Sequence, residues 1–453
     1  MKNTFLIIGL IFIFSASVFA QTDTTAADTA RVKVKKLSGK KKKEPKEKKV
    51  KKADRIVEEQ QADVPADTSK KTILFRANIG DSTNITNQDA IYNRPFISFG
   101  RSKTAIGGYI EGNTNYFAED GVSEGFSMEL RRFNIFLYSS ISQRIRFLSE
   151  LEFEHGTEEI AIETAQIDFE VNTALNFRGG IILPQIGLVN ANHDSPNWEF
   201  IDRPLSSTQI IPTTLSEVGF GLHGKFFFSD NIVSYNAYVV NGLSENIILN
   251  EEGKTFIPAG KSEEMFGEDN NGEPMYNARV AITNRKAGEV GVSYYGGVYN
   301  KYQIEGEEVE KKQRLDMFAV DFSAQLYEAT VQGEYVFAKI GIPGNLEELY
   351  GGRQNGGFIE IIYPFYEMKV LNYENAKFLA SFRAENIDYN EGRFAATAQE
   401  IGDEVVALVG GLSFRPTAST VFKANYRYQW NYDFLGNPPS ILGGFQVGFA
   451  TYF

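Results

Sequence analysis

Apolar and polar side chains alternate with a period of two along most of the chain from Thr104 onward. Residues 144–154 are typical, because charged side chains share one face and the other face carries Ile145, Phe147, Leu151 and Phe153. A β-strand directs successive side chains to opposite faces, so the pattern predicts strands with one apolar and one hydrated face. These segments run about 10 to 15 residues, the length that crosses a bilayer at a tilt.

Sixteen such segments can be placed along the chain, and an even number is what a bacterial β-barrel requires. We expect them to start near residues 104, 126, 144, 158, 175, 217, 232, 276, 288, 314, 329, 353, 377, 404, 418 and 441. Short and long connections mostly alternate, as periplasmic turns and external loops do. Two connections fit less well, because the turn at 368–376 is long and the loop at 155–157 is short.

Aromatic residues crowd the ends of these segments, as at Tyr116 and Phe117, which is typical of the girdles at membrane interfaces. The last segment alternates up to Phe453, so we expect the last strand to pair with the first and leave no open edge in lipid. The sequence therefore predicts an all-β fold, a transmembrane antiparallel β-barrel over residues 104–453 in the bacterial outer membrane.

One connection, residues 186–216, is too polar and too broken by proline to form a strand or a helix. At about 31 residues it is also long for an ordinary connection. A loop of this kind between two clean strands is positioned to fold into the barrel and narrow its lumen. We expect the constriction residues to be Asn190, Asn192, His193, Asp194, Glu199, Asp202 and Arg203.

The N-terminal part of the chain has a different composition. Residues 1–20 carry Lys2, a short apolar run and small residues before a cleavage site, as a secretory signal peptide does. Residues 21–75 are rich in lysine and cannot bury a core, so we expect a disordered periplasmic segment. Within it, residues 31–55 have a net charge of +11. Residues 76–103 form a lead-in segment before the barrel.

The positive charge of the basic segment offsets part of the negative charge of the barrel in the net charge of the chain. The whole chain has a net charge of −12, and since the first 75 residues carry +8, residues 76–453 carry −20. A strongly acidic folded part argues against nucleic acid as a partner. The chain has no cysteine, which suits an exported protein that does not depend on disulfides.

Many charged residues fall in the hydrated phase of the expected strands, where they would face the lumen. Arcs of charge select ions in a pore through their local field, and each such residue is equally suited to a structural salt bridge. We expect pore-lining residues at Arg144, Arg146, Glu150, Asp168, Arg279, Arg285, Asp321, Glu334, Arg383, Glu385, Lys423 and Arg427.

Sequence motifs for chemistry are weak. Residues 219–224 match G-x-G-x-x-G, but they lie inside an expected strand, whereas a dinucleotide site needs a helix after the motif. The three histidines, His155, His193 and His223, lack the spacing of a metal-binding pair. We therefore expect no enzyme, no cofactor and no metal site.

Several runs in the first half of the barrel resemble a known family, the phosphate-selective porins O and P, in a form like that of Bacteroidota. The runs are Leu130–Phe133, Arg144–Glu154, Ile167–Phe169, Leu175–Leu188 and Ile211–Phe226. The resemblance covers roughly residues 100–453 and implies a homotrimeric, sixteen-stranded porin whose third loop folds into the pore. Members of the family pass anions along lumenal Arg and Lys, whereas this barrel is acidic overall.

Together these features predict an outer-membrane porin in which small hydrophilic solutes or ions, with phosphate implied by the resemblance, diffuse through a charged, loop-constricted pore. We expect outer-membrane lipid around the barrel, and lipopolysaccharide bridged by divalent ions to the acidic outer loops. An alternative stays open: the protein is a structural anchor whose basic segment binds a periplasmic partner or a cell-wall polymer.

Overall fold

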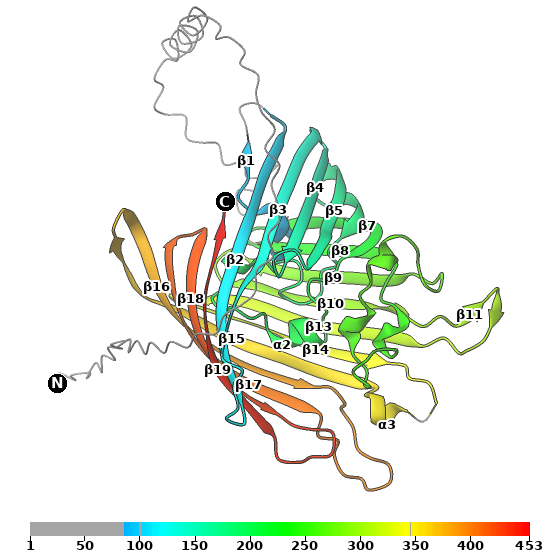
Figure 1. The fold of residues 1–453 in the computed structure, drawn as a ribbon. Helices are drawn as coiled ribbons and strands as arrows, with labels where there is room; N and C mark the ends of the chain where they lie inside the picture. The colour runs from blue at the N-terminus through cyan, green and yellow to red at the C-terminus, as the bar shows by residue number, and fades with distance from the viewer. Residues whose placement is uncertain (1–85, 99–101, 345) are drawn as a thin grey trace, which may run out of the picture. The chain divides into compact units, whose positions relative to one another are not determined.

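A closed barrel of sixteen antiparallel strands makes up most of the described protein (Figure 1). The computed structural model describes residues 86–98, 102–344 and 346–453, so the expected signal peptide and Lys-rich segment lie outside the described residues. The barrel strands are β2 Thr104–Glu119, β3 Phe126–Ser142, β4 Ile145–Glu154, β5 Glu159–Asn172, β6 Leu175–Ile182, β7 Glu217–Phe228, β8 Asn231–Val240, β9 Met275–Asn284, β10 Gly288–Val298, β13 Arg314–Leu326, β14 Ala329–Ile340, β15 Arg353–Val370, β16 Tyr373–Asp388, β17 Glu404–Thr417, β18 Thr420–Asn431 and β19 Ser440–Tyr452.

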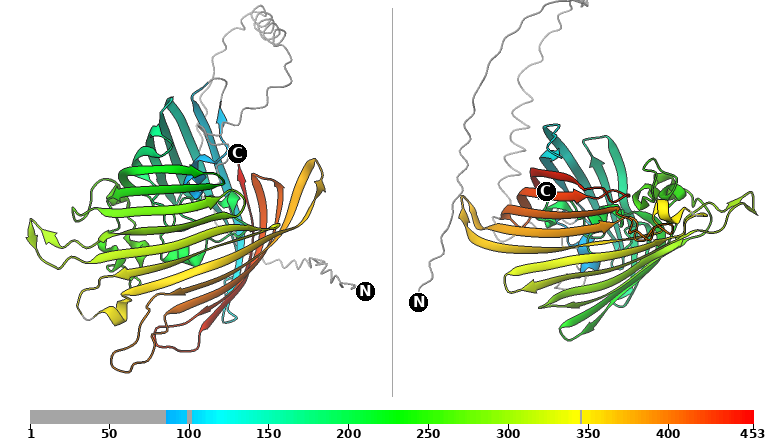
Figure 2. Two further views of the ribbon diagram at one scale, coloured as in Figure 1. Left: turned by 180° about the vertical axis from the view of Figure 1, so that it is seen from behind. Right: turned by 90° about the horizontal axis from the view of Figure 1, so that it is seen from below.

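Pairing of the last strand with the first closes the barrel. Each strand pairs with its neighbours along the chain, as the succession of strands from green to orange in Figure 2 shows. The register of β19 on β2 runs from Leu442 opposite Glu119 to Tyr452 opposite Tyr109. Closure leaves no barrel strand with an unpaired edge in lipid. The predicted sixteen-stranded antiparallel barrel is confirmed.

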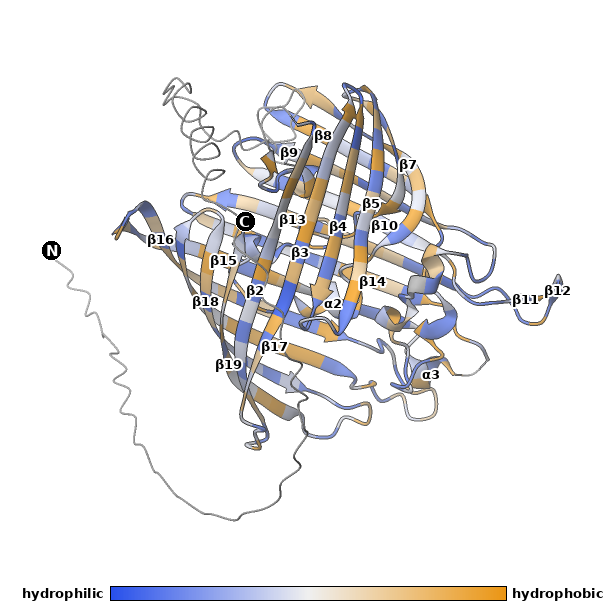
Figure 3. Cartoon of the chain, turned by 45° about the horizontal axis from the view of Figure 1, so that its top comes forward, coloured by the Kyte–Doolittle hydropathy of each residue, from blue (hydrophilic) through white to orange (hydrophobic). Residues whose placement is uncertain are grey.

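The outer face of the barrel is apolar, and its interior holds polar and charged side chains together with one buried apolar cluster. More than half of each outward side chain on β9 and β10 is exposed at Val280, Ile282, Val290 and Val292. The inward side chains of the same strands, such as Arg279 and Ser293, are buried. Figure 3 shows the resulting alternation of hydrophobic and hydrophilic residues along the strands. Such a surface belongs in lipid, and the closed barrel lies in the bacterial outer membrane, as predicted.

The residues that the structure describes include no helix that is both long and apolar enough to cross a bilayer.

The two connections that fitted the pattern least well do not change the strand count. β15 runs to Val370 and β16 begins at Tyr373, so the long turn expected at 368–376 is a two-residue turn. That expectation was wrong because the register shifts after Pro364, which has no N–H to donate, and the shift interrupts the alternation. The loop between β4 and β5, residues 155–158, is short as expected.

Two segments occupy the interior of the barrel. The connection between β6 and β7, residues 183–216, contains η2 (Ser195–Asn197) and α2 (Leu205–Gln209). The described part of the lead-in segment, residues 86–98, contains η1 (Asn87–Tyr92) and β1 (Ile97–Ser98), and β1 pairs with the start of β2. Both segments contact inward side chains of the barrel wall, as described below.

The remaining short elements lie in the external loops. They are η3 Glu245–Ile247, η4 Ile257–Gly260, η5 Glu263–Phe266, β11 Gln303–Ile304, β12 Glu307–Glu308 and α3 Glu347–Tyr350. β11 and β12 form a two-stranded hairpin of their own. The long loops therefore all leave one end of the barrel, which we call the long-loop end, and the tight turns lie at the other, the short-turn end.

The loop over residues 183–216 has an apolar side as well as the expected polar one. Ile186, Ile210 and Leu215 belong to a buried cluster with Tyr295 of β10 and Met317 of β13. Apolar burial of this kind fixes a segment against a wall without any charge. The loop is therefore packed as a folded part of the barrel interior.

Candidate functional site

The constriction loop, residues 183–216, is closed at its base by the side chain of Asn190. The Asn190 Nδ2 donates to the carbonyl oxygens of Pro184 at 2.7 Å and Leu215 at 3.2 Å. The Leu215 N–H in turn donates to Asn190 Oδ1 at 2.8 Å. Since Asn190 is fully buried, these bonds are shielded from water. Asn190 therefore positions the loop, whereas the sequence placed it only among constriction residues.

Four cations on the inner face of β16, β17 and β18 form what we call the basic wall. Its members are Arg383, Arg415, Lys423 and Arg427. The buried Lys423 donates from Nζ to the carbonyl oxygens of Ser195 and Phe200, each at 2.9 Å. An ammonium group that satisfies two carbonyl oxygens holds the main chain of the loop against this wall.

The acidic residues of the loop face the basic wall. Arg415 Nε lies 2.6 Å from Glu199 Oε1. Arg383 Nη1 donates to the carbonyl oxygen of Asp202 at 2.9 Å, and the Asp202 carboxylate lies 2.9 Å from Arg131 Nη2 on β3. Glu199 therefore fastens the loop to the basic wall through an ion pair, and Asp202 fastens it to β3. Both are predicted constriction residues.

Carboxylates on the inner face of β2, β4 and β5 form the acidic wall, on the other side of the seam where β19 meets β2. Its members are Glu111, Glu150, Glu152 and Glu163. His193 Nε2 lies 3.1 Å from Glu163 Oε2. Ser195 Oγ donates to Glu111 Oε2 at 2.5 Å. The same short stretch of the loop therefore contacts both walls.

Glu163 reaches the interior through a β-bulge. Glu150 pairs with Thr164 and Leu151 pairs with Ile162, so Glu163 is an extra residue on β5. Glu163 and Thr164 are consequently both buried, although they are adjacent in sequence. Bulges re-aim side chains and are frequent beside functional sites. Strict alternation could not select Glu163, because the bulge changes the phase at that residue.

The lead-in segment enters the lumen and meets the loop through Arg94. Arg94 Nη1 lies 2.7 Å from Glu150 Oε2, and its Nη2 lies 2.6 Å from Asp194 Oδ1. At the other end of the segment, the Asn87 N–H donates to Glu289 Oε2 on β10 at 3.0 Å. Arg94 thus joins the lead-in segment, the wall and the loop. Sequence reasoning missed it because the lead-in carries no periodic pattern.

Glu334 and Glu385 hold the loop on the far arc of the barrel. Ser206 Oγ donates to Glu334 Oε1 and the Leu188 N–H donates to Glu334 Oε2, both at 2.9 Å. The Leu205 N–H donates to Glu385 Oε2 at 2.7 Å. These carboxylates accept from the Leu205 N–H and the Ser206 hydroxyl in the first turn of α2, and from the Leu188 N–H near the beginning of the loop. The loop therefore contacts the barrel wall on several sides of the lumen.

Most of the predicted pore-lining residues face the interior. They are Arg146, Glu150, Asp168, Arg279, Asp321, Glu334, Arg383, Glu385, Lys423 and Arg427. Many are already paired within the wall, as Arg279 Nη2 is with Asp321 Oδ1 at 2.5 Å. Arg178 and Glu360 are further inward partners that the sequence did not single out. Whether the set lines an ion path stays a prediction.

Arg144 and Arg285 do not face the interior, so their predicted orientation is corrected here. Both side chains are exposed, and they lie in the tight turns that follow β3 and β9. The alternating phase was extended past the end of each strand, into residues whose main chain has already left the pleat.

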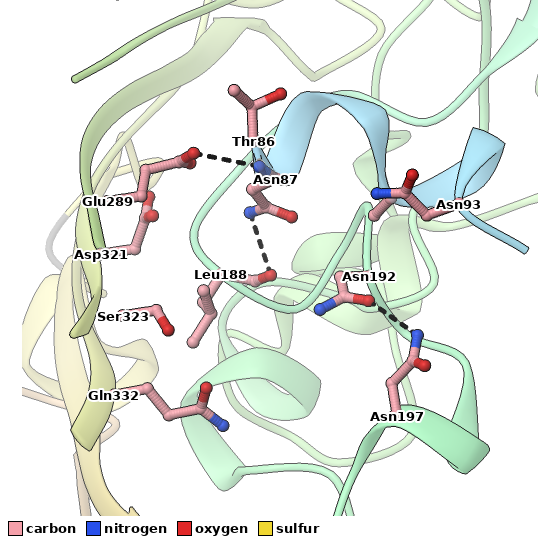
Figure 4. Close-up of a pocket in the computed structure, with 11 residues that line it drawn as sticks. Thr86, Asn87, Asn93, Leu188, Asn192, Asn197, Glu289, Asp321, Ser323 and Gln332 are labelled. Atoms are coloured by element: carbon pink, nitrogen blue, oxygen red, sulfur yellow. Dashed lines mark hydrogen bonds between the residues drawn. The ribbon is translucent and has the colours of Figure 1, made fainter. Parts of the chain in front are cut away.

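Two cavities flank the constriction loop. The outer cavity, about 340 Å³, lies toward the long-loop end and is lined mainly by Arg131, Arg132, Asp202, Arg203, Leu205 and Arg427. The inner cavity, about 300 Å³, lies toward the short-turn end, between the loop and η1 (Figure 4). Its polar lining includes Asn87, Asn192, Asn197, Glu289, Asp321 and Gln332. The outer cavity is rich in arginine, and the inner cavity is lined by carboxylates and amides.

No family model matches the chain. An uncharacterized protein of Aquifex aeolicus (strain VF5) is 26% identical over 346 residues, which are 71% of this chain and 74% of the relative. The anion-selective porin from Comamonas acidovorans aligns with 77% of this chain and 99% of its own, at 10% identity and a TM-score of 0.48. OmpF of Salmonella typhi, in a complex with daunomycin, aligns with 79% and 100%, at 10% identity and a TM-score of 0.49.

These similarities are too low to assign a family. The strand pairing itself shows a closed, sixteen-stranded antiparallel outer-membrane β-barrel. The phosphate-selective family that the sequence resembles stays a prediction.

Proposed function

We propose that the protein is an outer-membrane channel through which small hydrophilic solutes or ions diffuse. A sixteen-stranded barrel is wide enough to leave an aqueous channel when no loop fills it. Here the constriction loop and the lead-in segment take up much of that width. The proposal assigns to the loop the control of pore size and assigns no chemical step to the protein.

The observation that carries this proposal is the position of the two cavities. They lie on opposite faces of a loop that is fastened to walls on several sides. A solute path would lead from the outer cavity, past the loop, to the inner cavity. Because the loop is tied down by buried polar contacts, we expect a narrow path of steady conductance rather than a wide and noisy one.

Ion selectivity is the finer part of the proposal. The arginines of the outer cavity, Arg131, Arg132 and Arg203, support the anion preference that the family resemblance implies. Glu289 and Asp321 of the inner cavity oppose it. The sign of the reversal potential in a tenfold KCl gradient distinguishes anion from cation selectivity. An anion preference would support phosphate as a solute, and a cation preference would contradict it.

Deletion of residues 190–203 tests the role of the loop. The deletion removes the contacts to both walls, so the single-channel conductance in a planar bilayer should rise several-fold. A matched control removes residues 303–308, the external hairpin of β11 and β12, and should leave the conductance unchanged. If the loop deletion has no larger effect than the hairpin deletion, the loop does not set the pore size.

The alternative of a structural anchor is retained because the N-terminal segment is so basic. Truncation of residues 21–71 separates the two functions. A channel should keep its conductance after the truncation, whereas an anchor should lose retention on cell-wall material. Folded protein without any conductance would favour the anchor.

Assembly and surroundings are also proposals. The resemblance favours a homotrimer, which chemical cross-linking in membranes would test. The acidic external loops favour divalent bridges to lipopolysaccharide, and removal of divalent ions with a chelator should then loosen the association of lipopolysaccharide with the barrel.

A further inference from the structure

A buried cluster of potential metal ligands joins the constriction loop to the acidic wall. Glu150 on β4, Glu163 at the bulge of β5 and His193 of the loop each offer one ligand atom, all within 4.8 Å of one another. His193 Nε2 lies 3.1 Å from Glu163 Oε2 and 3.9 Å from Glu150 Oε1. We propose that these three residues bind a divalent transition-metal ion that fastens the loop to the wall.

The orientation of His193 supports this proposal. Its Nδ1 lies 3.0 Å from the carbonyl oxygen of Asn190, which can only accept, so Nδ1 carries the hydrogen. The Nε2 of a neutral ring then points a lone pair at the oxygens of Glu163, Glu150 and Asp194. Lone pairs facing carboxylates require a cation between them, either a proton on the ring or a metal ion. A histidine that binds a metal through one ring nitrogen usually donates the N–H of its other nitrogen to a carbonyl or carboxylate oxygen.

Buried polar atoms that lack a hydrogen-bond donor also support a metal ion at this site. Among the described residues, Glu163 Oε1 and Asn134 Oδ1 are buried and receive no hydrogen bond from an N–H or hydroxyl group. The carboxyl of Glu163 also lies within hydrogen-bonding reach of the carboxyl of Glu152. Asn134 is fully buried, and its Nδ2 lies 2.7 Å from Glu150 Oε1 and 3.4 Å from Glu163 Oε2. The two ends of an amide have nearly the same shape, so a rotated Asn134 would offer Oδ1 as a further ligand.

Carboxylates outnumber cations around His193. Four carboxylates meet there: Glu150, Glu152, Glu163 and Asp194. The described cations in salt bridges with them are Arg94 and Arg132, and Arg132 is shared with Glu111 and Glu154. Arg203 and Lys261 act on Glu163 through their charge without a salt bridge to it. Buried carboxylates in such excess are costly unless a further positive charge is bound. A divalent ion supplies that charge.

The donor set indicates the class of ion. One imidazole nitrogen with two or three oxygens suits zinc, manganese and related ions, whereas calcium and magnesium prefer oxygen alone. Ligand atoms around a tetrahedral zinc ion are about 3.3 Å apart, close to the spacings of 3.1 Å and 3.9 Å seen here. The ligands were invisible to motif searching, because Glu163 and His193 are 30 residues apart in sequence.

Binding of Zn²⁺ alone to the purified, refolded full chain tests the site. After removal of metals with a chelator, equilibrium dialysis and elemental analysis should find about one zinc ion per barrel. His193→Gln and the milder Glu163→Gln should each weaken zinc binding at least tenfold. The control is His155→Gln, because His155 is an exposed histidine paired with Glu129 and lies outside the cluster.

Two further measurements keep the test decisive. Heat-dependent migration in gels shows whether each variant still forms a closed barrel. Binding of Co²⁺ gives visible absorption bands that report nitrogen and oxygen ligands, and these bands should be absent from the His193→Gln variant. Equal zinc uptake by wild type and His193→Gln would overturn the site. No uptake by folded wild type would also overturn it and would assign the positive charge to a proton on His193. Neither readout depends on whether the barrel conducts.

Discussion

The two sides of the β2–β19 seam hold the same loop in different ways. On the basic wall, Lys423 and Arg415 each meet an acceptor that the loop supplies, so charge is matched by direct contact. On the acidic wall, Glu150 and Glu163 lie beside a single histidine, and the neighbouring Glu152 shares Arg132 with other carboxylates. On the basic wall these two cations are paired with acceptors of the loop. On the acidic wall the carboxylates need a further cation to balance their charge.

The difference has a physical consequence for the loop. Buried ion pairs with fixed partners change little with the solution as long as both partners remain charged. A surplus of carboxylates responds to protons and to metal ions. The basic wall therefore determines where the loop lies, and the acidic wall determines under which conditions it is held. Four predictions, from the largest expected effect to the smallest, test this comparison.

Arg94→Met should have the largest effect. The substitution leaves Glu150 and Asp194 without their shared guanidinium, and breaking a buried pair of this kind costs about 3–5 kcal/mol. Hydrogen exchange of residues 86–98 should accelerate strongly as the lead-in segment leaves the lumen. Arg144→Met, in an exposed turn, is the matched control and should change nothing. Unchanged exchange would mean that Arg94 does not hold the segment.

Lys423→Met should have the second largest effect, because it leaves the buried carbonyl oxygens of Ser195 and Phe200 without their hydrogen-bond donor. Two buried acceptors without partners cost about 2–4 kcal/mol together. The temperature at which the barrel unfolds in gels should fall, and open-channel noise should rise. Lys369→Met, in an exposed pair with Glu374, serves as the control. A Lys423 variant as stable as this control would contradict the role of the basic wall.

The third prediction compares one carboxylate from each side. Glu199→Gln removes the charge that faces Arg415 and should destabilise the barrel by about 1–3 kcal/mol. Glu152→Gln removes one of the surplus charges, and Arg132 keeps its contacts to Glu111. In metal-free buffer we therefore expect it to be neutral or stabilising. Denaturant midpoints of both variants measure the contrast, and equal losses would remove the distinction between the walls.

The smallest effect is expected outside the lumen, where Lys312 Nζ lies 2.6 Å from Glu273 Oε1. Hydrogen bonds from Lys312 and Tyr302 hold the pKa of Glu273 below its ordinary value. The stabilisation from these bonds is fully present above the pKa that Glu273 has in the unfolded chain. It is lost as the pH falls through the lower pKa of Glu273 in the folded protein. Since the pair is exposed, Glu273→Gln should leave the unfolding midpoint at pH 7 unchanged within error. A clear loss would show that this external contact is structural.

Much of the barrel is predictable from the sequence, because a membrane strand must alternate and must pair on both sides. The strand starts and the closing contact between β19 and β2 follow from that constraint. The same rule fails where the chain leaves the regular pleat. Arg144 and Arg285 lie in turns, Pro364 shifts a register, and Glu163 stands at a bulge.

The candidate site was less predictable than the wall. Asn190, His193, Asp194 and Glu199 could be selected because a polar, proline-broken stretch between two strands is unusual. Their partners could not be assigned, because contacts such as Lys423 with Ser195 join residues more than 200 positions apart. Arg94 and the burial of residues 86–98 were also missed, since a short aperiodic segment carries no sign of being enclosed.

One contact of the loop bears on how the molecule is made. Tyr452 Oη on β19 donates to Asp194 Oδ2 at 2.8 Å, and Ser195 Oγ donates to Glu111 on β2. Two adjacent residues thus bridge the first and last strands from inside. Pairing strands so distant in sequence is slow, because their ends must find each other. We infer that the loop is a template for the final strand pairing, so that the variant lacking residues 190–203 should refold more slowly even if its finished barrel conducts better.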